Sequence, residues 1–187
     1  MRFATHGSAL ALGLAAFAAQ AQGLRLDSPD IQAGKAVPNK FVFNGFGCTG
    51  GNVSPALSWK NAPRGTQSFA LLMHDPDAPS GGAGWWHWVV TNIPATASAL
   101  EQGAGTADGA KLPAGSHQVN TDFGAPGYGG PCPPPGDKPH RYNFTLYALK
   151  VDKLDLPPTA TASLAGYMAN ANAIGKATLQ VVYHRSK

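Results

Sequence analysis

Two short segments of this sequence carry acids and histidines on backbone that proline makes rigid. HDPDAP occupies His74–Pro79, and GGPCPPPGDKPHRY occupies Gly129–Tyr142. Proline fixes φ and has no N–H to donate, and the residue before it is pushed to extended geometry. Neither segment is therefore predicted to be helix or central strand. Stiff loops that bear ionisable side chains are common places for binding and catalytic sites.

The acids and histidines of these segments could do three kinds of chemistry. Asp75 and Asp77 flank Pro76, while His87 and His140 each stand at the start of a predicted strand. If those strands are neighbours, the four side chains gather at one end of a sheet. Carboxylates and imidazoles together can bind a metal ion, transfer protons in a hydrolase, or hold a small anion.

The first two interpretations find little support in the spacing of the residues. No short metal motif such as H-E-x-x-H is present, and the proline between the acids keeps them off one helical face. The chain has no G-x-S-x-G motif, and no nucleophile stands among the acids and histidines. We therefore expect no metal ion and no cofactor. A secreted hydrolase that uses the Asp/His cluster, with or without a metal ion, is the alternative.

The third interpretation is a small anion pocket. Adjacent glycines such as Gly129 and Gly130 let backbone N–H groups point into a concavity, and histidines can donate to phosphate or carboxylate oxygens. Aspartates repel anions, so we expect them to orient the histidines or cap loop N–H groups rather than touch the ligand. Trp85 is the candidate for an aromatic rim, and Trp88 is expected in the core. The remaining histidines of the domain are expected to be structural or exposed: His74, His117 and His184.

These groups require a mostly β scaffold to position them. Glycine (23) and proline (16) punctuate nearly the whole chain and leave no room for long helices. The segments between them alternate or are rich in β-branched and aromatic residues, which is typical of strands. The predicted strands are Phe41–Asn44, Ala56–Trp59, Gln67–Asp75, His87–Pro94, His140–Lys150 and Ala177–Arg185. The continuous apolar runs FALLM and WVV predict central strands buried on both faces.

One segment has a helical pattern. Thr159–Ala173 is alanine-rich with apolar residues at helical spacing, and Gly175 supplies a stop signal. A short helical turn is expected within Pro94–Gly103, and Ala104–Gly127 forms a long connection of a kind that is often functional. The predicted fold class is therefore mostly β, an antiparallel β-sandwich with one or two short peripheral helices.

The N-terminal segment has the order of a secretory signal peptide. Arg2 is followed by small and apolar residues, and the segment ends in A-Q-A at Ala19–Ala21. The apolar run is short and alanine-rich for a bilayer span, and no later run is longer. We therefore expect residues 1–21 to be a signal peptide and residues 22–187 to form one domain with no membrane span. The predicted location is periplasmic or secreted.

Charge and cysteine content narrow the class of partner. The net charge is +4 and only 13% of residues are charged. The basic residues are scattered and form no stripe, so no nucleic-acid partner is expected. Two cysteines in an oxidising compartment favour one disulfide, between Cys48 and Cys132, and two buried free thiols are the alternative. A disulfide would bring two glycine-rich loops together.

Four motifs in combination resemble one known family. They are DPDAP, WHWVVTNIP, CTGGNVSPALSW and GYGGPCPPPGDKPHRYNFTLYAL. Together they are similar to the phosphatidylethanolamine-binding protein family, in its bacterial, Raf-kinase-inhibitor-like branch. The resemblance covers the chain from about Leu26 to Arg185.

The resemblance implies a β-sandwich with a small anion pocket at one end. The pocket positions that it implies are Asp75, Ala78, Pro79, Trp85, His87, Gly130, Pro131, His140 and Tyr142. It also implies a ligand such as a phosphate-like head group, and for some members inhibition of a protein partner, here a protease or a host enzyme. We therefore expect an exported protein that binds a small anion and modulates a protein partner, and that has no catalytic residues.

Overall fold

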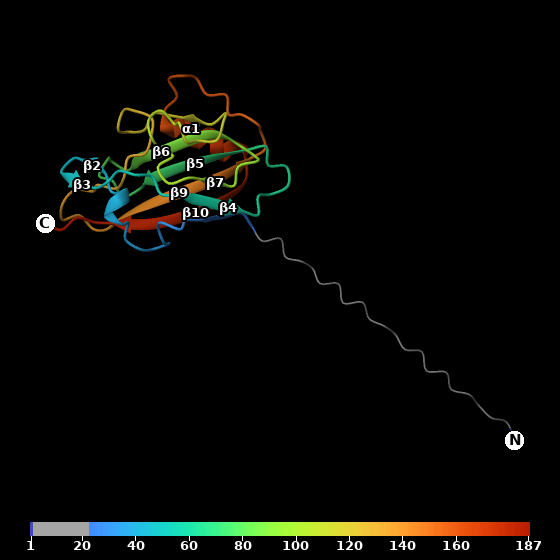
Figure 1. Ribbon diagram of the computed structural model, residues 1–187, viewed down its shortest axis with the longest axis horizontal. Helices are drawn as coiled ribbons and strands as arrows, with labels where there is room; N and C mark the ends of the chain where they lie inside the picture. The colour runs from blue at the N-terminus through green and yellow to red at the C-terminus, as the bar shows by residue number, and fades with distance from the viewer. Residues whose placement is uncertain (2–22) are drawn as a thin grey trace.

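The computed structural model describes Met1 and residues 23–187, so the expected signal peptide lies almost wholly outside the described residues. Figure 1 shows two sheets, a short hairpin and one helix. Every strand pairing within the sheets is antiparallel. The expected fold class, a mostly β antiparallel sandwich, is confirmed.

A five-stranded sheet is the centre of the molecule. Its order is β10 (Ala173–Tyr183), β9 (His140–Leu149), β5 (Ser68–Asp75), β6 (Trp85–Pro94) and β8 (His117–Gln118). A three-stranded sheet has the order β1 (Arg25–Asp27), β4 (Leu57–Lys60) and β7 (Ala99–Leu100). The larger core cluster lies between these two sheets, with side chains from both. The hairpin of β2 (Asn44–Gly45) and β3 (Cys48–Thr49) stands apart from them.

Strand β5 is buried on both faces, as its continuous apolar run predicts. Phe69, Leu71 and Met73 belong to the core between the sheets, whereas Ala70 and Leu72 belong to a second cluster on the opposite face. The period of two places successive side chains on opposite faces of the sheet. Each face therefore needs its own cover.

Helix α1 (Ala162–Asn172) covers that second face (Figure 1). The Thr161 side chain accepts a hydrogen bond from the Leu164 N–H at 3.1 Å, which caps the N-terminus. Ala162, Ala165 and Ala169 are buried against the sheet, and small side chains allow this close packing. The helix confirms the prediction at Thr159–Ala173 with slightly tighter bounds. No helix of the described residues is long and apolar enough to cross a membrane.

Two local predictions are wrong. Only Asn44 of the predicted strand Phe41–Asn44 lies in a strand, because Asn39–Phe41 forms a 3₁₀ turn and the Phe43 N–H bonds the Pro131 carbonyl at 3.2 Å. The segment Pro94–Gly103 holds no helical turn, because Ala99 and Leu100 pair with β4. In both places a long-range backbone partner overrides the local pattern.

Antiparallel pairing brings the candidate residues to one edge of the large sheet. Strand β5 runs antiparallel to both β6 and β9, so the end of β5 lies beside the starts of the other two. Asp75 is opposite Trp85, and His74 is opposite Asn143. The two proline-rich loops leave from this same edge. Asp75, His87 and His140 therefore converge because of the strand directions.

Candidate anion-binding site

A small cavity lies at this edge of the sheet. Its volume is about 170 Å³, enough for a small ligand. It is lined by Phe46, Asp75, Ala78, Pro79, Trp85, His87, Phe123, Cys132, Pro133, Pro134, His140 and Tyr142. Only the two histidines among these residues can carry a positive charge. Asp75 is the one acid of the lining, and most of the other residues are apolar or aromatic.

Asp75 and His140 form a buried pair beside the cavity. The His140 Nδ1 and Asp75 Oδ2 atoms are 2.8 Å apart, and each side chain is 4% exposed. The other carboxylate oxygen of Asp75 accepts a hydrogen bond from the Asp77 N–H at 2.9 Å. Asp75 therefore fixes both the imidazole ring and the proline-rich loop. The carboxylate accepts only, so Nδ1 of His140 carries a proton.

The second nitrogen of His140 faces another acid. Nε2 lies 3.4 Å from Oδ2 of Asp137, whose side chain is much more exposed than the histidine. Asp137 belongs to the loop between the proline run and β9. Both ring nitrogens of His140 thus face carboxylate oxygens.

His87 is held in a different way. Its Nδ1 atom lies 2.7 Å from the carbonyl oxygen of Gly129, and its own backbone carbonyl accepts from the Gly129 N–H at 2.9 Å. The ring is 3% exposed. Burial lowers the pKa of His87 to about 4, although the Gly129 carbonyl and the Asp75 carboxylate oppose that shift. His87 is therefore neutral at physiological pH.

The Tyr142 hydroxyl points toward the Asp75 carboxylate without reaching normal hydrogen-bond geometry. Its Oη atom is buried and makes no hydrogen bond of normal geometry within the described part of the chain. Burial raises the pKa of Tyr142, and the nearby Asp75 carboxylate raises it further. The hydroxyl is therefore protonated at all physiological pH values. A buried donor without a partner is costly, which marks the cavity as a place where a ligand atom belongs.

Asp77 does not line the cavity and ties its own loop to the start of β9. Its carboxylate bonds the guanidinium of Arg141 at 2.6 and 2.8 Å and accepts from the Arg141 N–H at 2.8 Å. These contacts match the expectation that an aspartate caps loop N–H groups. The hydrogen bond from the Arg141 side chain lowers the pKa of Asp77 to about 2.

We expect Asp77→Asn to destabilise the protein in a pH-dependent way. A carboxyl whose pKa is depressed in the folded state stabilises it above the ordinary value of 3.8, and that stabilisation is lost as the pH falls through about 2. The cost at neutral pH is under about 1 kcal/mol, because partly exposed ion pairs are screened. Denaturant unfolding at several pH values measures it. The difference in unfolding free energy between wild type and Asp77→Asn should disappear in acid.

Asp152→Asn is the matched control, since Asp152 is exposed and forms no ion pair with any of residues 23–187. Its unfolding free energy should equal that of wild type at every pH. If Asp77→Asn lowers the unfolding free energy by the same amount at neutral pH and in acid, the ion pair with Arg141 is not the cause.

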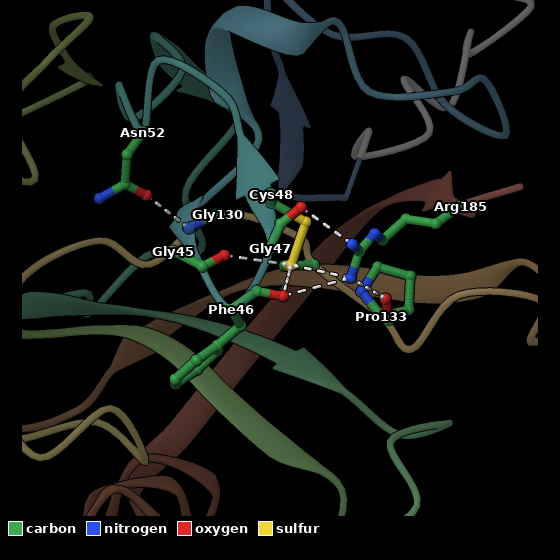
Figure 2. Close-up of a disulfide and its surroundings, with 9 residues drawn as sticks. Gly45, Phe46, Gly47, Cys48, Asn52, Gly130, Pro133 and Arg185 are labelled. Carbon is green, nitrogen blue, oxygen red and sulfur yellow. Dashed lines mark hydrogen bonds between the residues drawn. A yellow bond between two sulfur atoms is a disulfide. The ribbon is translucent and has the colours of Figure 1, made fainter. Parts of the chain in front are cut away.

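The glycine pair does not act as expected. The Gly129 N–H donates to the His87 carbonyl, and the Gly130 N–H donates to Asn52 Oδ1 at 2.8 Å (Figure 2). A Cβ on Gly130 would lie 2.2 Å from the Phe41 carbonyl oxygen, so this position needs glycine for close backbone approach. The expectation that these amides face an anion is corrected. Gly129 instead orients His87, and Gly130 packs the loop.

A disulfide joins the two loops that form the rim of the cavity. Cys48 and Cys132 are bonded, which confirms the predicted pairing. Figure 2 shows the Arg185 guanidinium beside this bond, where it donates to the carbonyl oxygens of Gly47 at 2.9 Å and of Phe46 and Pro133 at 3.3 Å. The covalent bond and the guanidinium therefore hold the β2–β3 hairpin against the proline run.

Comparison with known proteins identifies the family of this chain. The sequence pattern of the phosphatidylethanolamine-binding protein family matches residues 27–184. The chain belongs to the phosphatidylethanolamine-binding protein family. The resemblance seen in the four motifs is thereby confirmed over nearly all of the described residues.

Relatives of this phosphatidylethanolamine-binding protein family member occur in several bacteria. This chain is 49% identical to the UPF0098 protein YbcL of Escherichia coli strain K12, over 92% of this chain and 93% of that protein. The crystal structure of YbcL superposes with a TM-score of 0.84 over 87% of this chain and 99% of the other. The lipoprotein-named LppC of Mycobacterium tuberculosis is 42% identical, over 85% of this chain and 71% of that protein.

A more distant structure has the same fold. The phosphatidylethanolamine-binding protein homologue CT736 of Chlamydia trachomatis is 30% identical, over 88% of this chain and 99% of the other, with a TM-score of 0.72. The five-stranded sheet and its flanking loops are thus the framework on which this family member builds its cavity.

The cavity of this family member includes most of the sequence-predicted site residues. Those that line it are Asp75, Ala78, Pro79, Trp85, His87, His140 and Tyr142. Those that do not are Asp77, Gly129, Gly130 and Pro131, which shape the loops behind it. Trp88 is fully buried in the core as expected, and its Nε1 donates to Gln118 at 2.8 Å. His117 and His184 are exposed, and His74 bonds the Ala83 carbonyl at 3.1 Å.

Sequence reasoning missed two aromatic walls of the cavity. Phe46 and Phe123 stack with a centroid separation of 5.9 Å, and Phe123 also contacts the Trp85 and His87 rings edge-on. Phe46 is 69% exposed at the mouth of the cavity. The one available signal for Phe123 was its place in the long loop between residues 104 and 127. Among residues 23–187, no group of three or more His, Cys, Asp or Glu side chains is arranged to hold a metal ion.

Proposed function

We propose that this protein binds a small oxyanion, such as phosphate or the phosphoryl group of a larger molecule, in the cavity between His87 and His140. The observation that carries the proposal is the buried, unpartnered hydroxyl of Tyr142 beside the histidine that Asp75 orients. A tyrosine hydroxyl and two imidazole rings that line a small cavity suit an anionic oxygen. The apolar walls strengthen such bonds by excluding water.

The proposal includes export from the cytoplasm. The expected signal peptide at residues 1–21 supports it, and so does the disulfide, because such bonds persist in oxidising compartments. The name of the relative LppC, a lipoprotein, points to the cell envelope. We therefore infer a periplasmic or secreted protein.

An exposed ring at the mouth of the cavity supports a role toward a protein partner. Phe46 is the most exposed aromatic residue of the cavity lining and stands on the β2–β3 hairpin. Large aromatic side chains at a rim are frequent anchors in protein interfaces. In this second candidate function, an acidic group of a protease or a host enzyme enters the cavity while the partner's surface covers Phe46.

Calorimetry with inorganic phosphate tests the primary proposal. We expect the purified domain, residues 22–187, to bind one phosphate per chain. The apparent affinity for phosphate should weaken when acetate, a competing oxyanion, is added. No heat of binding at millimolar phosphate would contradict the proposal. Release of nitrophenol from p-nitrophenyl phosphate or acetate by wild type would favour the hydrolase alternative instead.

A further inference from the structure

A second cavity shares the Phe123 ring with the anion-binding cavity but no other residue. Its volume is about 440 Å³, which lies within the range of about 300–1,000 Å³ that is usual for small-molecule sites. Apart from Phe43, the residues that line it come from segments 52–54, 103–107 and 121–129. Most of these residues belong to the long connection of residues 104–127, whose length favours a functional role and which the anion-binding cavity hardly uses.

The lining of this second cavity is neutral. No Asp, Glu, Lys, Arg or His among residues 23–187 lines it, so it offers no charged partner to an anion or a cation. Val53 is its one branched aliphatic residue, which leaves an alkyl chain little apolar surface to cover. The polar side chains that line it are Asn52, Ser54, Thr106 and Thr121. The cavity therefore suits an uncharged polar molecule.

Ser54 presents a buried hydroxyl whose proton has no acceptor. The residue is 2% exposed, and its Oγ atom accepts a hydrogen bond from the Gly105 N–H at 2.9 Å. No oxygen of residues 23–187 accepts a hydrogen bond from this hydroxyl in return. A buried donor without an acceptor is costly, and a ligand oxygen in the cavity would remove that cost. The Ser54 hydroxyl thus marks a place for a ligand oxygen.

Asn52 and Thr106 add a donor and acceptors to the same wall. Asn52 donates one amide proton to the Tyr128 carbonyl at 3.2 Å and accepts from the Gly130 N–H at 2.8 Å. Its side chain is held at both ends and keeps one N–H available. Thr106 gives its proton to the Asp108 carboxylate at 2.6 Å, so its oxygen can only accept from a ligand. A ligand hydroxyl both donates and accepts, which matches this mixed wall.

Two phenylalanine rings add an aromatic surface to the cavity. The centroids of Phe43 and Phe123 are 4.6 Å apart, and both rings line the cavity. A Cβ on Gly129 would lie 2.3 Å from the Phe123 ring, so glycine allows this ring to pack directly on the backbone. The face of an aromatic ring is electronegative and attracts the polarised C–H groups of a sugar ring. The cavity thus combines hydroxyl partners with an aromatic surface.

We propose that this second cavity binds an uncharged saccharide. One face of the sugar ring packs on Phe43 and Phe123. The sugar hydroxyls accept from Ser54 and Asn52 and donate to Thr106. Because no charged or titratable group is shared with the anion-binding cavity, the saccharide binds whether or not phosphate is present.

Amide chemical shifts of the isotope-labelled domain, residues 22–187, test the inference. The probes are four uncharged sugars: the methyl glycosides of glucose, galactose, mannose and N-acetylglucosamine. At least one of them should shift the amides of residues 103–107 and 127–129 in a saturable way at millimolar concentration. Amides beside His140 should not move. No saturable shift with any of the four sugars would overturn the inference, and so would larger shifts with the neutral peptide analogue N-acetylalanine amide.

Ala125→Trp provides a blocking variant. Ala125 lines the cavity and is exposed, so an indole there fills the cavity without entering the core. The saturable sugar-induced shifts should be lost. Ala110→Trp is the matched control, because Ala110 is an exposed alanine of the same long loop outside the cavity, and its shifts should persist. Ala107→Trp, from another lining segment, repeats the test if Ala125→Trp does not fold.

The two sites are separated by comparing the two ligands. The sugar-induced shifts should survive His140→Ala, since His140 lines only the anion-binding cavity. Shifts that persist in a folded Ala125→Trp protein would overturn the inference. A wild-type protein that binds phosphate but no sugar would overturn only the inference, and one that binds sugar but no phosphate would overturn only the proposed function.

Discussion

His140→Ala should abolish phosphate binding, with an affinity loss of at least about a hundredfold. The imidazole is the one lining side chain whose orientation is set by a buried carboxylate, through the 2.8 Å contact with Asp75. A hydrogen bond from such a group to an anion contributes about 1.5–3 kcal/mol. The substitution also leaves the Asp75 carboxylate unpaired beside the ligand, and this added repulsion makes the loss larger. Calorimetric titration with phosphate measures the effect.

His184→Ala is the matched control, because His184 is exposed and lies outside the cavity. Its phosphate affinity should equal that of wild type. A circular dichroism spectrum and an unfolding curve establish that His140→Ala is folded. Unchanged phosphate affinity in a folded His140→Ala protein would show that phosphate does not bind in this cavity.

The second large effect concerns the disulfide. Replacing both Cys48 and Cys132 by serine should lower the unfolding free energy by about 2–4 kcal/mol, because the bond closes a long loop in the unfolded chain. The two residues are 84 positions apart in the sequence. Phosphate binding should also weaken, since Cys132 and Phe46 line the cavity and the bond holds their two loops together. Denaturant unfolding and calorimetry measure the two effects.

Reduction of the wild-type protein provides the control for this experiment. Wild type in reductant should behave like the double serine variant, and the variant should not respond to reductant at all. Equal stability of oxidised wild type and the variant would show that Arg185, which bonds three carbonyl oxygens of the same loops, holds the rim by itself.

The strands and their convergence could be predicted from the sequence. The apolar run of β5 and the alternation of β9 have few interpretations other than a central strand and its neighbour. Because the acids end one strand and each histidine begins another, antiparallel pairing alone brings Asp75, His87 and His140 to one edge. The family motifs added Ala78 and Pro79, which local patterns do not single out.

The hydrogen-bond partners of loop groups could not be predicted in the same way. Gly130 looks like a free anion-binding amide in the sequence, but its partner Asn52 is 78 positions away. Phe41–Asn44 looks like a strand, but the Phe43 N–H bonds the Pro131 carbonyl of the proline-rich loop. Such partners depend on how distant segments pack, which no local pattern encodes. Asp137 was missed for the same reason, because its contact with His140 depends on the path of the loop.

The protonation of the histidines also depends on structure. The sequence places aspartates near two histidines and suggests that they orient both rings. The structure shows that Asp75 bonds only His140, while the Gly129 carbonyl holds His87 and burial dominates its pKa. The two histidines are therefore held by different partners.

A crystal structure of the protein soaked in inorganic phosphate tests the central claim most directly. One phosphate should lie in the cavity, with its oxygens within hydrogen-bond distance of Tyr142 Oη and of the Nε2 atoms of His87 and His140. The Asp137 carboxylate should also move away from His140. Phosphate bound only elsewhere on the surface, with the Tyr142 hydroxyl still unpartnered, would contradict the account.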